Sequence, residues 1–288
     1  MTALRELAPA KINLCLFLGP TRADGRHELL TLFDSVTLYD ELSVEPAGSD
    51  HVACQGVAGP NLVGDALSAL RAAGWDGPPV HVEIDKRIPV AAGMGGGSAD
   101  AAAMLRVAVR LAPVADDVLT RIAASLGADV PAQLDPGPSI GTGAGEVLEP
   151  LAALPPYGVL VLPQAFALST AEVYREADRL GLGRTADELS ALRRRLTPAL
   201  PAELVVNDLA AAALSLAPSL ADVLAVVRGA GADDALVCGS GPTVIGLYRG
   251  TDGVERASAA ADGLRTDFPA ATSAAPVGRG VLDSTANE

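Results

Sequence analysis

Hydrophobic and polar residues alternate in several short stretches of the chain, and this alternation predicts β-strands. In KINLCLFL, residues 11–18, the even-numbered positions are all apolar, and Lys11 and Asn13 lie on the other face. Because side chains on a strand repeat every two residues, Lys11 and Asn13 are predicted to point the same way. Further strands are predicted over residues 36–44, 80–84, 157–162, 234–238 and 243–248.

Apolar residues recur every three to four positions between these strands, which predicts helices. The segments expected to be helical include 61–74, 116–127, 207–216 and the stretch that follows the glycines near residue 95. Strands and helices alternate in both halves of the chain, so we expect an α+β fold with mixed sheets. A stretch rich in Gly and Pro, residues 136–156, predicts a hairpin and then a junction between two domains, 1–155 and 156–288.

The sequence PVAAGMGGGSADAA, residues 89–102, places four glycines and Ser98 directly before a predicted helix. Backbone N–H groups at a helix start, free of nearby side chains, form an anion site. A flexible surface loop is the alternative. Neither of the common phosphate-binding glycine motifs is present, since no G-x-x-x-x-G-K-[ST] occurs and Ser98 stands where G-x-G-x-x-G needs its last glycine.

Composition narrows the choice of partner. The net charge of −14 disfavours nucleic acid as a ligand, so an anionic ligand would need local positive groups to hold it. Three widely spaced cysteines are typical of a reducing compartment, and the three histidines follow no metal-ligand spacing. The first 19 residues resemble neither a signal peptide nor a membrane span, so we expect a cytoplasmic protein with no membrane partner.

The glycine loop resembles the P-x-x-x-G-[LM]-G-(G/S)-x-S-[SA] loop of the GHMP kinases. Two other motifs of that family occur in the expected order, PAKINL at residues 9–14 and GSGPTVIGL at 239–247. The resemblance implies an N-terminal domain like ribosomal protein S5, a ferredoxin-like C-terminal α/β domain and an active site in the cleft between them. It also implies ATP with Mg2+ as cofactor. The implied ATP contacts are Asn61, Pro89, Val90, Ala91, Ala92, Gly93, Met94, Gly95, Gly96, Gly97, Ser98 and Ala99.

Within the family, the segment ADGRHELLTLFDSVTLYDEL resembles the kinases that phosphorylate the 2-hydroxyl of a diphosphocytidyl-methylerythritol in the non-mevalonate route to isoprenoids. The resemblance implies that small-molecule substrate, bound by a monomer or homodimer. Those kinases usually carry an aromatic residue before the histidine of D-G-x-H, whereas this chain has Arg26. A guanidinium can also stack on a base. Two rivals stay open, a GHMP kinase with a non-cytidine acceptor and a nucleotide-binding protein without catalysis.

The resemblance assigns Lys11 and Asp129 as the catalytic pair. A phosphoryl acceptor needs a carboxylate to orient its hydroxyl or take its proton, and a lysine to stabilise developing charge. The alternatives without catalysis are that Lys11 is a solvated lysine on a strand, and that Asp129 only caps the turn at Pro131. Ser98, implied to reach the phosphates or the metal ion, could instead be only a helix cap.

The resemblance also implies the residues that bind the acceptor. His27 would read the cytosine edge, with Arg26 and Tyr174 on the two faces of the base, although a lone loop histidine often has no such role. Asn13, which shares a strand face with Lys11, and Thr170 would contact the rest of the acceptor. For the GSGP turn at 239–242, a tight hairpin is a sufficient explanation by itself, so its glycines are expected only to support the site.

Overall fold

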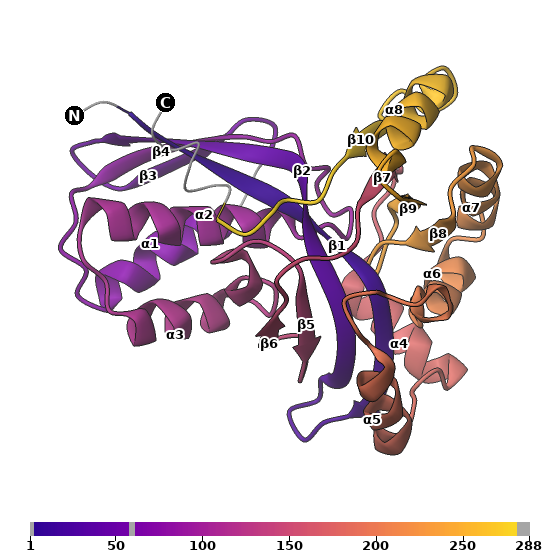
Figure 1. The fold of residues 1–288 in the computed structure, drawn as a ribbon. Helices are drawn as coiled ribbons and strands as arrows, with labels where there is room; N and C mark the ends of the chain where they lie inside the picture. The colour runs from indigo at the N-terminus through magenta and orange to yellow at the C-terminus, as the bar shows by residue number, and fades with distance from the viewer. Residues whose placement is uncertain (1–2, 58–60, 281–288) are drawn as a thin grey trace.

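The computed structural model describes residues 3–57 and 61–280 of the chain, and it contains two sheets (Figure 1). The first has six strands in the order β3-β4-β2-β5-β6, with β1 paired to β2, and its β3–β4 pair is parallel. Its strands are β1 (Leu4–Thr21), β2 (His27–Pro46), β3 (His51–Cys54), β4 (Val80–Asp85), β5 (Ser139–Thr142) and β6 (Val147–Pro150). The fold is therefore of the mixed α+β class that the alternation of strands and helices predicted.

Three helices cover one face of the first sheet, below it in Figure 1. Their apolar sides pack with Leu42 and Val44 of β2 and with Val82 of β4 in a single buried cluster. The helices are α1 (Leu62–Ala72), α2 (Gly96–Leu111) and α3 (Asp116–Leu126), followed by a 3-10 turn, η1 (Pro131–Gln133). Helix α2 lies against β1 and so brings its first turn next to Lys11.

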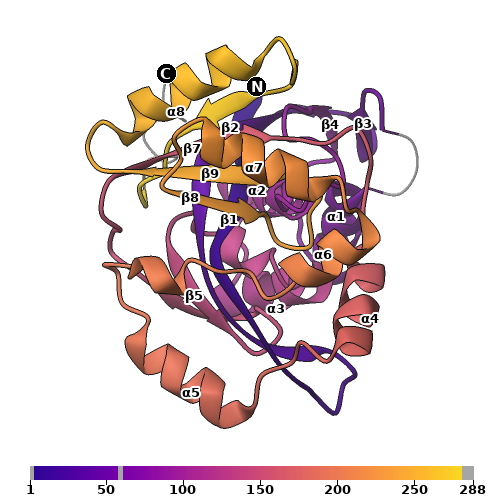
Figure 2. The ribbon, with the colours of Figure 1, turned by 90° about the vertical axis from the view of Figure 1, so that its right-hand side faces the viewer.

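The second sheet is antiparallel, in the order β10-β7-β9-β8, and helices α6, α7 and α8 contribute to the core beside it (Figure 2). Its strands are β7 (Tyr157–Leu162), β8 (Asp234–Val237), β9 (Val244–Arg249) and β10 (Thr272–Ala274). The helices of this half are α4 (Thr170–Leu180), α5 (Ala186–Arg195), α6 (Ala210–Leu216), α7 (Leu220–Gly229) and α8 (Gly253–Leu264), with a 3-10 turn η2 (Ala202–Leu204). Among the described residues, no helix is both long and apolar enough to cross a membrane.

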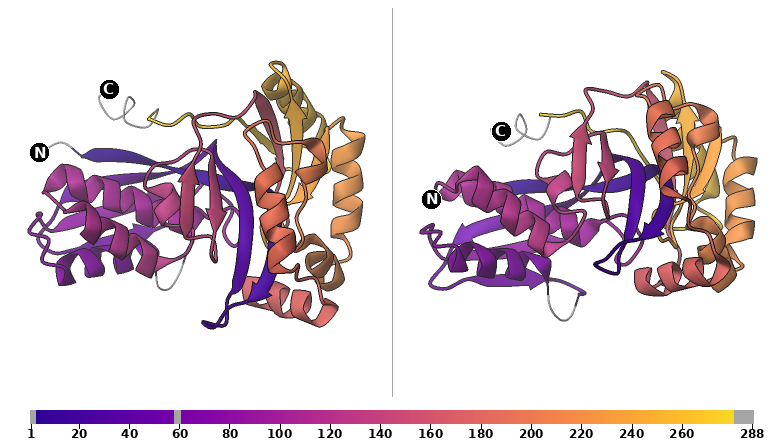
Figure 3. Two further views of the ribbon diagram at one scale, coloured as in Figure 1. Left: turned by 60° about the horizontal axis from the view of Figure 1, so that its bottom comes forward. Right: turned by 90° about the horizontal axis from the view of Figure 1, so that it is seen from below.

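The two sheets share a core. Ile12 and Leu14 of β1 pack in one buried cluster with Val159 of β7 and Ile245 of β9. The segment between β6 and β7, residues 151–156, joins the sheets and contains the predicted domain boundary. Viewed from below, the long β1–β2 hairpin extends alongside the second half (Figure 3). The two halves are therefore held together by buried apolar contacts as well as by the connecting chain.

The prediction that side chains alternate regularly between two faces over residues 11–18 is wrong beyond Asn13. The pairing of β1 with β2 shifts register between Asn13 and Cys15, so the regular alternation of faces is interrupted at Leu14. After this irregularity Phe17 joins the core between the sheets, whereas Leu16 lines the same cavity as Lys11 and Asn13. A bulge changes which side chains face which way without any change in the apolar pattern of the sequence. The strand is also longer than predicted, and His27, expected in a loop, begins β2.

Candidate active site

A cavity of about 540 Å3 opens between the two halves. It has two ends, which we name by the ligands that the sequence resemblance implies for them. The phosphate end consists of the glycine loop, residues 89–98, and the start of α1; the acceptor end consists of α4, β2 and the loop 143–146. Residues predicted for the site that line this cavity are Lys11, Asn13, Asn61, 89–98, Asp129, Thr170 and Tyr174. Ala99, Arg26 and His27 do not line it.

The glycine loop is packed against backbone on its far side. Gly93 and Gly95 have φ of +76° and +68°, a region that favours glycine. A Cβ built on Gly93 would lie 2.4 Å from the carbonyl oxygen of Cys238 and 2.9 Å from that of Gly241. The alternative of a flexible surface loop is therefore wrong, and the GSGP turn supports the loop by direct backbone contact.

Helix α2 begins at Gly96, with Gly95 in the N-cap position and no side chain capping it. Ser98 lies in the first turn of the helix and is not its cap. The N–H groups of a first helical turn have no partner within the helix, and they carry the positive end of its dipole. Since Gly95, Gly96, Gly97 and Ser98 all line the cavity, this end is suited to an anion.

Asn61 both lines the cavity and caps α1. Its side chain accepts a hydrogen bond from Val63 N at 2.8 Å.

Lys11 and Asp129 meet where the two ends join. The ammonium nitrogen of Lys11 donates to Asn13 Oδ1 at 2.9 Å and lies 3.4 Å from Asp129 Oδ2. The Lys11 side chain is only 12% exposed, which excludes a solvated strand lysine. Asn13 in turn donates to Thr31 Oγ1 at 2.8 Å, which fixes the orientation of its amide. No side chain caps the turn at Pro131, so Asp129 is not an N-cap.

Tyr174 forms part of the wall at the acceptor end. Burial, and secondarily the negative charge of Asp129, raises the pKa of Tyr174 to about 12, so its hydroxyl stays neutral. Thr170, at the start of α4, shares a hydrogen bond of 2.9 Å with the Ser240 hydroxyl and so connects α4 to the GSGP turn. The acceptor end therefore offers an aromatic side chain and hydroxyl groups close to the carboxylate.

His27 and Arg26 lie behind or beside this wall. His27 is buried, its Nδ1 is 3.0 Å from the Gly19 carbonyl oxygen, and its Nε2 is 3.0 Å from Asp178 Oδ1. Its ring centre is 5.6 Å from that of Tyr174. The guanidinium of Arg26 is exposed and donates to Asp24. His27 therefore lies behind Tyr174, which lines the cavity. The guanidinium of Arg26 is bound by Asp24, within the same turn.

Two family models match the chain, GHMP kinases N terminal domain over residues 61–137 and GHMP kinases C terminal over residues 185–265. A curated relative, 4-diphosphocytidyl-2-C-methyl-D-erythritol kinase of Streptomyces coelicolor, is 43% identical over 92% of this chain and 96% of its own length. The relative of the same name from Salinispora tropica is 39% identical over 95% of this chain and 92% of its own.

The chain is a GHMP kinase. A crystal structure of 4-(cytidine 5'-diphospho)-2C-methyl-D-erythritol kinase superposes with a TM-score of 0.77 at 38% identity, covering 96% of this chain and 100% of that one. Mevalonate kinase of L. major, in complex with R-mevalonate, superposes with a TM-score of 0.68 over 95% and 96% of the two chains. At 15% identity, this second likeness shows the fold alone.

At the phosphate end this GHMP kinase holds an ion cluster that the sequence did not predict, and two of its members, Lys86 and Asp100, line the cavity. Lys86 donates to Asp40 and, at 2.8 Å, to Asp100 Oδ2. Asp40 is fully buried and also accepts from the backbone N–H groups of Arg87 and Ile88. Burial raises the pKa of Asp100 to about 7, against the opposing effect of Lys86. The only sequence signal was two charges that flank the glycine loop, which resemble ordinary surface residues.

Asn207 is a second residue of the GHMP kinase that sequence reasoning did not assign. Its side-chain nitrogen donates to the carbonyl oxygens of Val237 and Gly239 at 2.8 and 2.7 Å. These two residues lead into the turn that supports Gly93. The sequence NDL contained this residue, but a single asparagine gives no indication of two backbone partners 30 and 32 residues away.

Proposed function

We propose that this GHMP kinase transfers the γ-phosphoryl group of ATP to the 2-hydroxyl of 4-diphosphocytidyl-2-C-methyl-D-erythritol, in the non-mevalonate route to isoprenoid precursors, and that it works in the cytoplasm. The observation that carries the proposal is the Lys11–Asp129 pair at the junction of the two ends of the cavity. A donor phosphate on the glycine loop and an acceptor beside Tyr174 would both reach this pair. The names of the relatives supply the identity of the acceptor.

Asp129 and Lys11 divide the chemistry. Asp129 accepts a hydrogen bond from the acceptor hydroxyl and takes its proton as the new phosphorus–oxygen bond forms, while the bond between the γ-phosphorus and the bridging oxygen breaks and ADP leaves. Lys11 stabilises the negative charge on the transferring group, and Asn13 fixes the direction of the ammonium. Loop amides from 95 to 98 hold the phosphates in place. Catalysis rests on positioning and electrostatics, because phosphoryl transfer asks little covalent chemistry of the protein.

Mg2+ belongs to this proposal through the chemistry of its donors. The described residues contain no group of three or more His, Cys, Asp or Glu placed to hold a metal ion. Magnesium is commonly held by one or two protein oxygens together with substrate phosphates and water. The Ser98 hydroxyl, which lines the cavity, fits that pattern, and Asp129 is left to act on the acceptor. When bound there, the ion would neutralise phosphate charge.

The remaining acceptor residues have distinct roles in the proposal. Tyr174 stacks on the base, and Thr170 binds the rest of the acceptor. His27 would act on the base from the side of Tyr174, after giving up one of its present partners, Gly19 or Asp178. Arg26 can reach the base only after its guanidinium leaves Asp24. The loop backbone completes the nucleotide side without Ala99, which is fully buried and does not line the cavity.

The test measures ADP release with Mg-ATP and each of four acceptors: the cytidine substrate, mevalonate, homoserine and galactose. We expect turnover of the cytidine substrate alone. Asp129→Asn should lower kcat by roughly 10²–10⁴-fold with little change in either KM. Asp117→Asn, which alters an exposed carboxylate of α3, is the matched control and should keep wild-type rates. Turnover of another acceptor only would refute the substrate, and full activity of Asp129→Asn would refute the role of Asp129.

A further inference from the structure

The acceptor end depends on two loops that are far apart in the sequence. One is the turn of residues 22–26 between β1 and β2; the other is the loop 143–146 between β5 and β6. Ala144 and Gly145 of the second loop line the cavity, together with Leu29, just after the turn. Leu29 N donates to the carbonyl oxygen of Gly143 at 2.6 Å, so the loops touch through backbone. The position of this part of the wall therefore depends on what keeps the two loops together.

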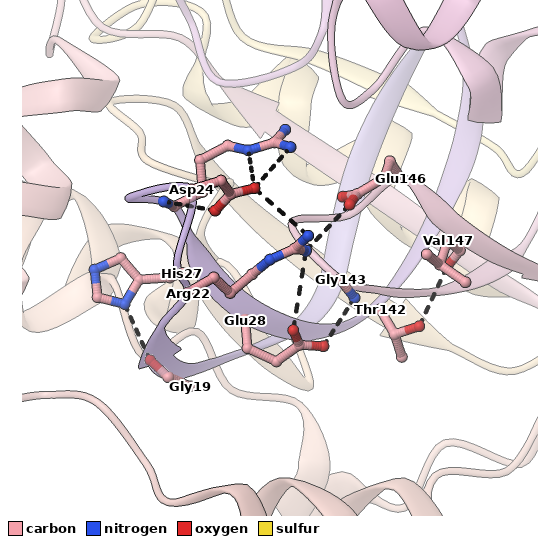
Figure 4. A network of polar contacts seen from close by, with 10 residues as sticks. Gly19, Arg22, Asp24, His27, Glu28, Thr142, Gly143, Glu146 and Val147 are labelled. Carbon is pink, nitrogen blue, oxygen red and sulfur yellow. Dashed lines mark hydrogen bonds and ion pairs between the residues drawn. The ribbon is translucent and has the colours of Figure 1, made fainter. Parts of the chain in front are cut away.

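Arg22 connects the two loops, as Figure 4 shows. Its Nη1 donates to Glu146 Oε1 at 3.1 Å and lies 3.9 Å from Glu28 Oε2. Glu28 in turn accepts from the backbone N–H of Gly143 at 2.9 Å. Arg22 is itself fixed by its own turn, since its backbone N–H donates to the carbonyl oxygen of Arg26 at 2.7 Å.

The loop 143–146 packs against one side of the guanidinium through Gly143 and Glu146. Gly143 has φ of +70°, and a Cβ built on it would lie 3.0 Å from Arg22 Nη1 and 2.9 Å from Glu146 Oε1. There is no room for a side chain between the arginine and the loop. The fit is thus one of shape as well as charge.

The charges explain why an arginine is needed here. Three carboxylates, Asp24, Glu28 and Glu146, lie near Arg22. Within residues 3–57 and 61–280, only Asp24 has a second guanidinium, that of Arg26. Without Arg22, Glu28 and Glu146 would repel each other across the contact between the loops. A guanidinium is charged at any physiological pH, and the hydrogen bond with Glu146, the largest influence, raises the pKa of Arg22 further.

We propose that Arg22 is a positioning residue for the acceptor: it holds the loop 143–146 against the β1–β2 turn and so keeps Ala144 and Gly145 in the cavity wall. Arg22 does not itself line the cavity. The proposal rests on the proposed function only in taking this end of the cavity as the acceptor end. Arg22 and Glu146 are only partly buried, and an ion pair near the surface usually adds little to global stability. The role of Arg22 is therefore local, and it should be visible in binding of the acceptor more than in unfolding.

The first experiment needs no substrate. In hydrogen–deuterium exchange of the ligand-free protein, Arg22→Gln should speed exchange in peptides covering 22–29 and 143–147, while the glycine loop exchanges as in the wild type. Arg22→Lys keeps the positive charge but loses the two-pronged guanidinium, so its exchange rates in these peptides should lie between those of wild type and Arg22→Gln. Arg121→Gln, which breaks an exposed arginine–aspartate pair on α3, is the matched control. Unchanged exchange in both loops of Arg22→Gln would overturn the proposal.

The second experiment uses whichever acceptor the wild type turns over. Arg22→Gln should raise the KM for that acceptor on the order of tenfold, with the KM for ATP unchanged. Glu146→Gln should act in the same direction, and the double variant should be no worse than Arg22→Gln alone. An equal rise in both KM values would overturn the proposal. Failure of the cytidine substrate itself would refute the proposed function and leave the exchange result standing.

Discussion

The two ends of the cavity are built in different ways. At the phosphate end, one continuous stretch forms the loop and the helix start, and the loop packs on the backbone of residues 238–241. At the acceptor end, α4, β2 and the loop 143–146 come from separate parts of the chain and are joined mainly through side chains, besides one backbone hydrogen bond from Leu29 to Gly143. A site that is held by backbone packing tolerates few substitutions in its sequence. A site that is held by pairs of side chains can change its specificity by a single substitution.

The largest loss of stability should result from removal of the charge of Lys86 at the phosphate end. Lys86→Met leaves Asp40 and Asp100 buried without their cation, which should lower the free energy of unfolding by about 3–5 kcal/mol. Urea unfolding measures this loss, and Asp100→Asn in the same chain should recover part of it. Arg87→Met, beside it but exposed, should have a far smaller effect. Equal losses for Lys86→Met and Arg87→Met would contradict the view of this end as rigidly supported.

Gly93→Ala tests the backbone contact directly. The added methyl would meet two carbonyl oxygens at a residue with positive φ, and the expected cost is on the order of 3 kcal/mol, together with most of the activity. Denaturant unfolding and ADP release give the two readouts. Gly64→Ala in α1 is the control, because a Cβ there meets nothing within 4 Å, and it should stabilise by roughly 0.5–1 kcal/mol. A Gly93→Ala protein as stable and active as wild type would disprove the packing argument.

The pH dependence of stability should depend on two buried carboxyls, Asp100 at the phosphate end and Asp34 at the junction of the sheets. Burial raises the pKa of both Asp100 and Asp34 to about 7, from an ordinary value near 4. Each carboxyl binds its proton more tightly in the folded chain, so its contribution to stability is full below about pH 4 and is lost as the pH rises to about 7. Urea unfolding of Asp100→Asn and Asp34→Asn from about pH 4 to about pH 8 should each show a smaller fall than wild type.

A bound nucleotide refines this test. The negative charge of a triphosphate near Asp100 should raise its pKa further and shift its part of the fall to higher pH. Asp34, at the junction of the sheets and hydrogen-bonded to the Tyr157 hydroxyl at 2.8 Å, should be unaffected. A non-hydrolysable ATP analogue supplies the measurement. The same shift in both variants would mean that the nucleotide does not act on Asp100 locally.

Arg26→Ala should give the smallest effect on folding. Its guanidinium is exposed and pairs only with Asp24 among the described residues, so the free energy of unfolding should change by less than ~0.5 kcal/mol. Its effect on the KM for the acceptor should be smaller than that of Tyr174→Ala, because Tyr174 lines the cavity and Arg26 does not. If Arg26→Ala raised that KM more than Tyr174→Ala, Arg26 would have to leave Asp24 when the acceptor binds.

The same contrast explains how much of the molecule could be predicted from its sequence. The glycine loop, its helix and the residues Lys11 and Asp129 were predicted because contiguous motifs carry them. The Arg22–Glu146 bond joins residues 124 positions apart, and no local pattern indicates such a pair. Nor did the sequence reveal the burial of Lys86 and Asp100, since a charge is assigned to the surface until its partners are known. Helices and strands, which follow from local periodicity, were predicted well. Side-chain contacts between residues far apart in the sequence were not.

The irregularity at Leu14 has a consequence for anyone who would transplant this chemistry. Before it, β1 presents Lys11 and Asn13 to the cavity; after it, Leu16 takes that side and Phe17 turns into the core. Copying PAKINL onto a regular strand of another scaffold would therefore reproduce the letters and misdirect the side chains beyond the motif. A transplant would have to include the motif together with the register shift that follows Asn13. Deletion of one residue at the shift would turn the cavity-facing side chains of the later strand into the core, and the core side chains into the cavity.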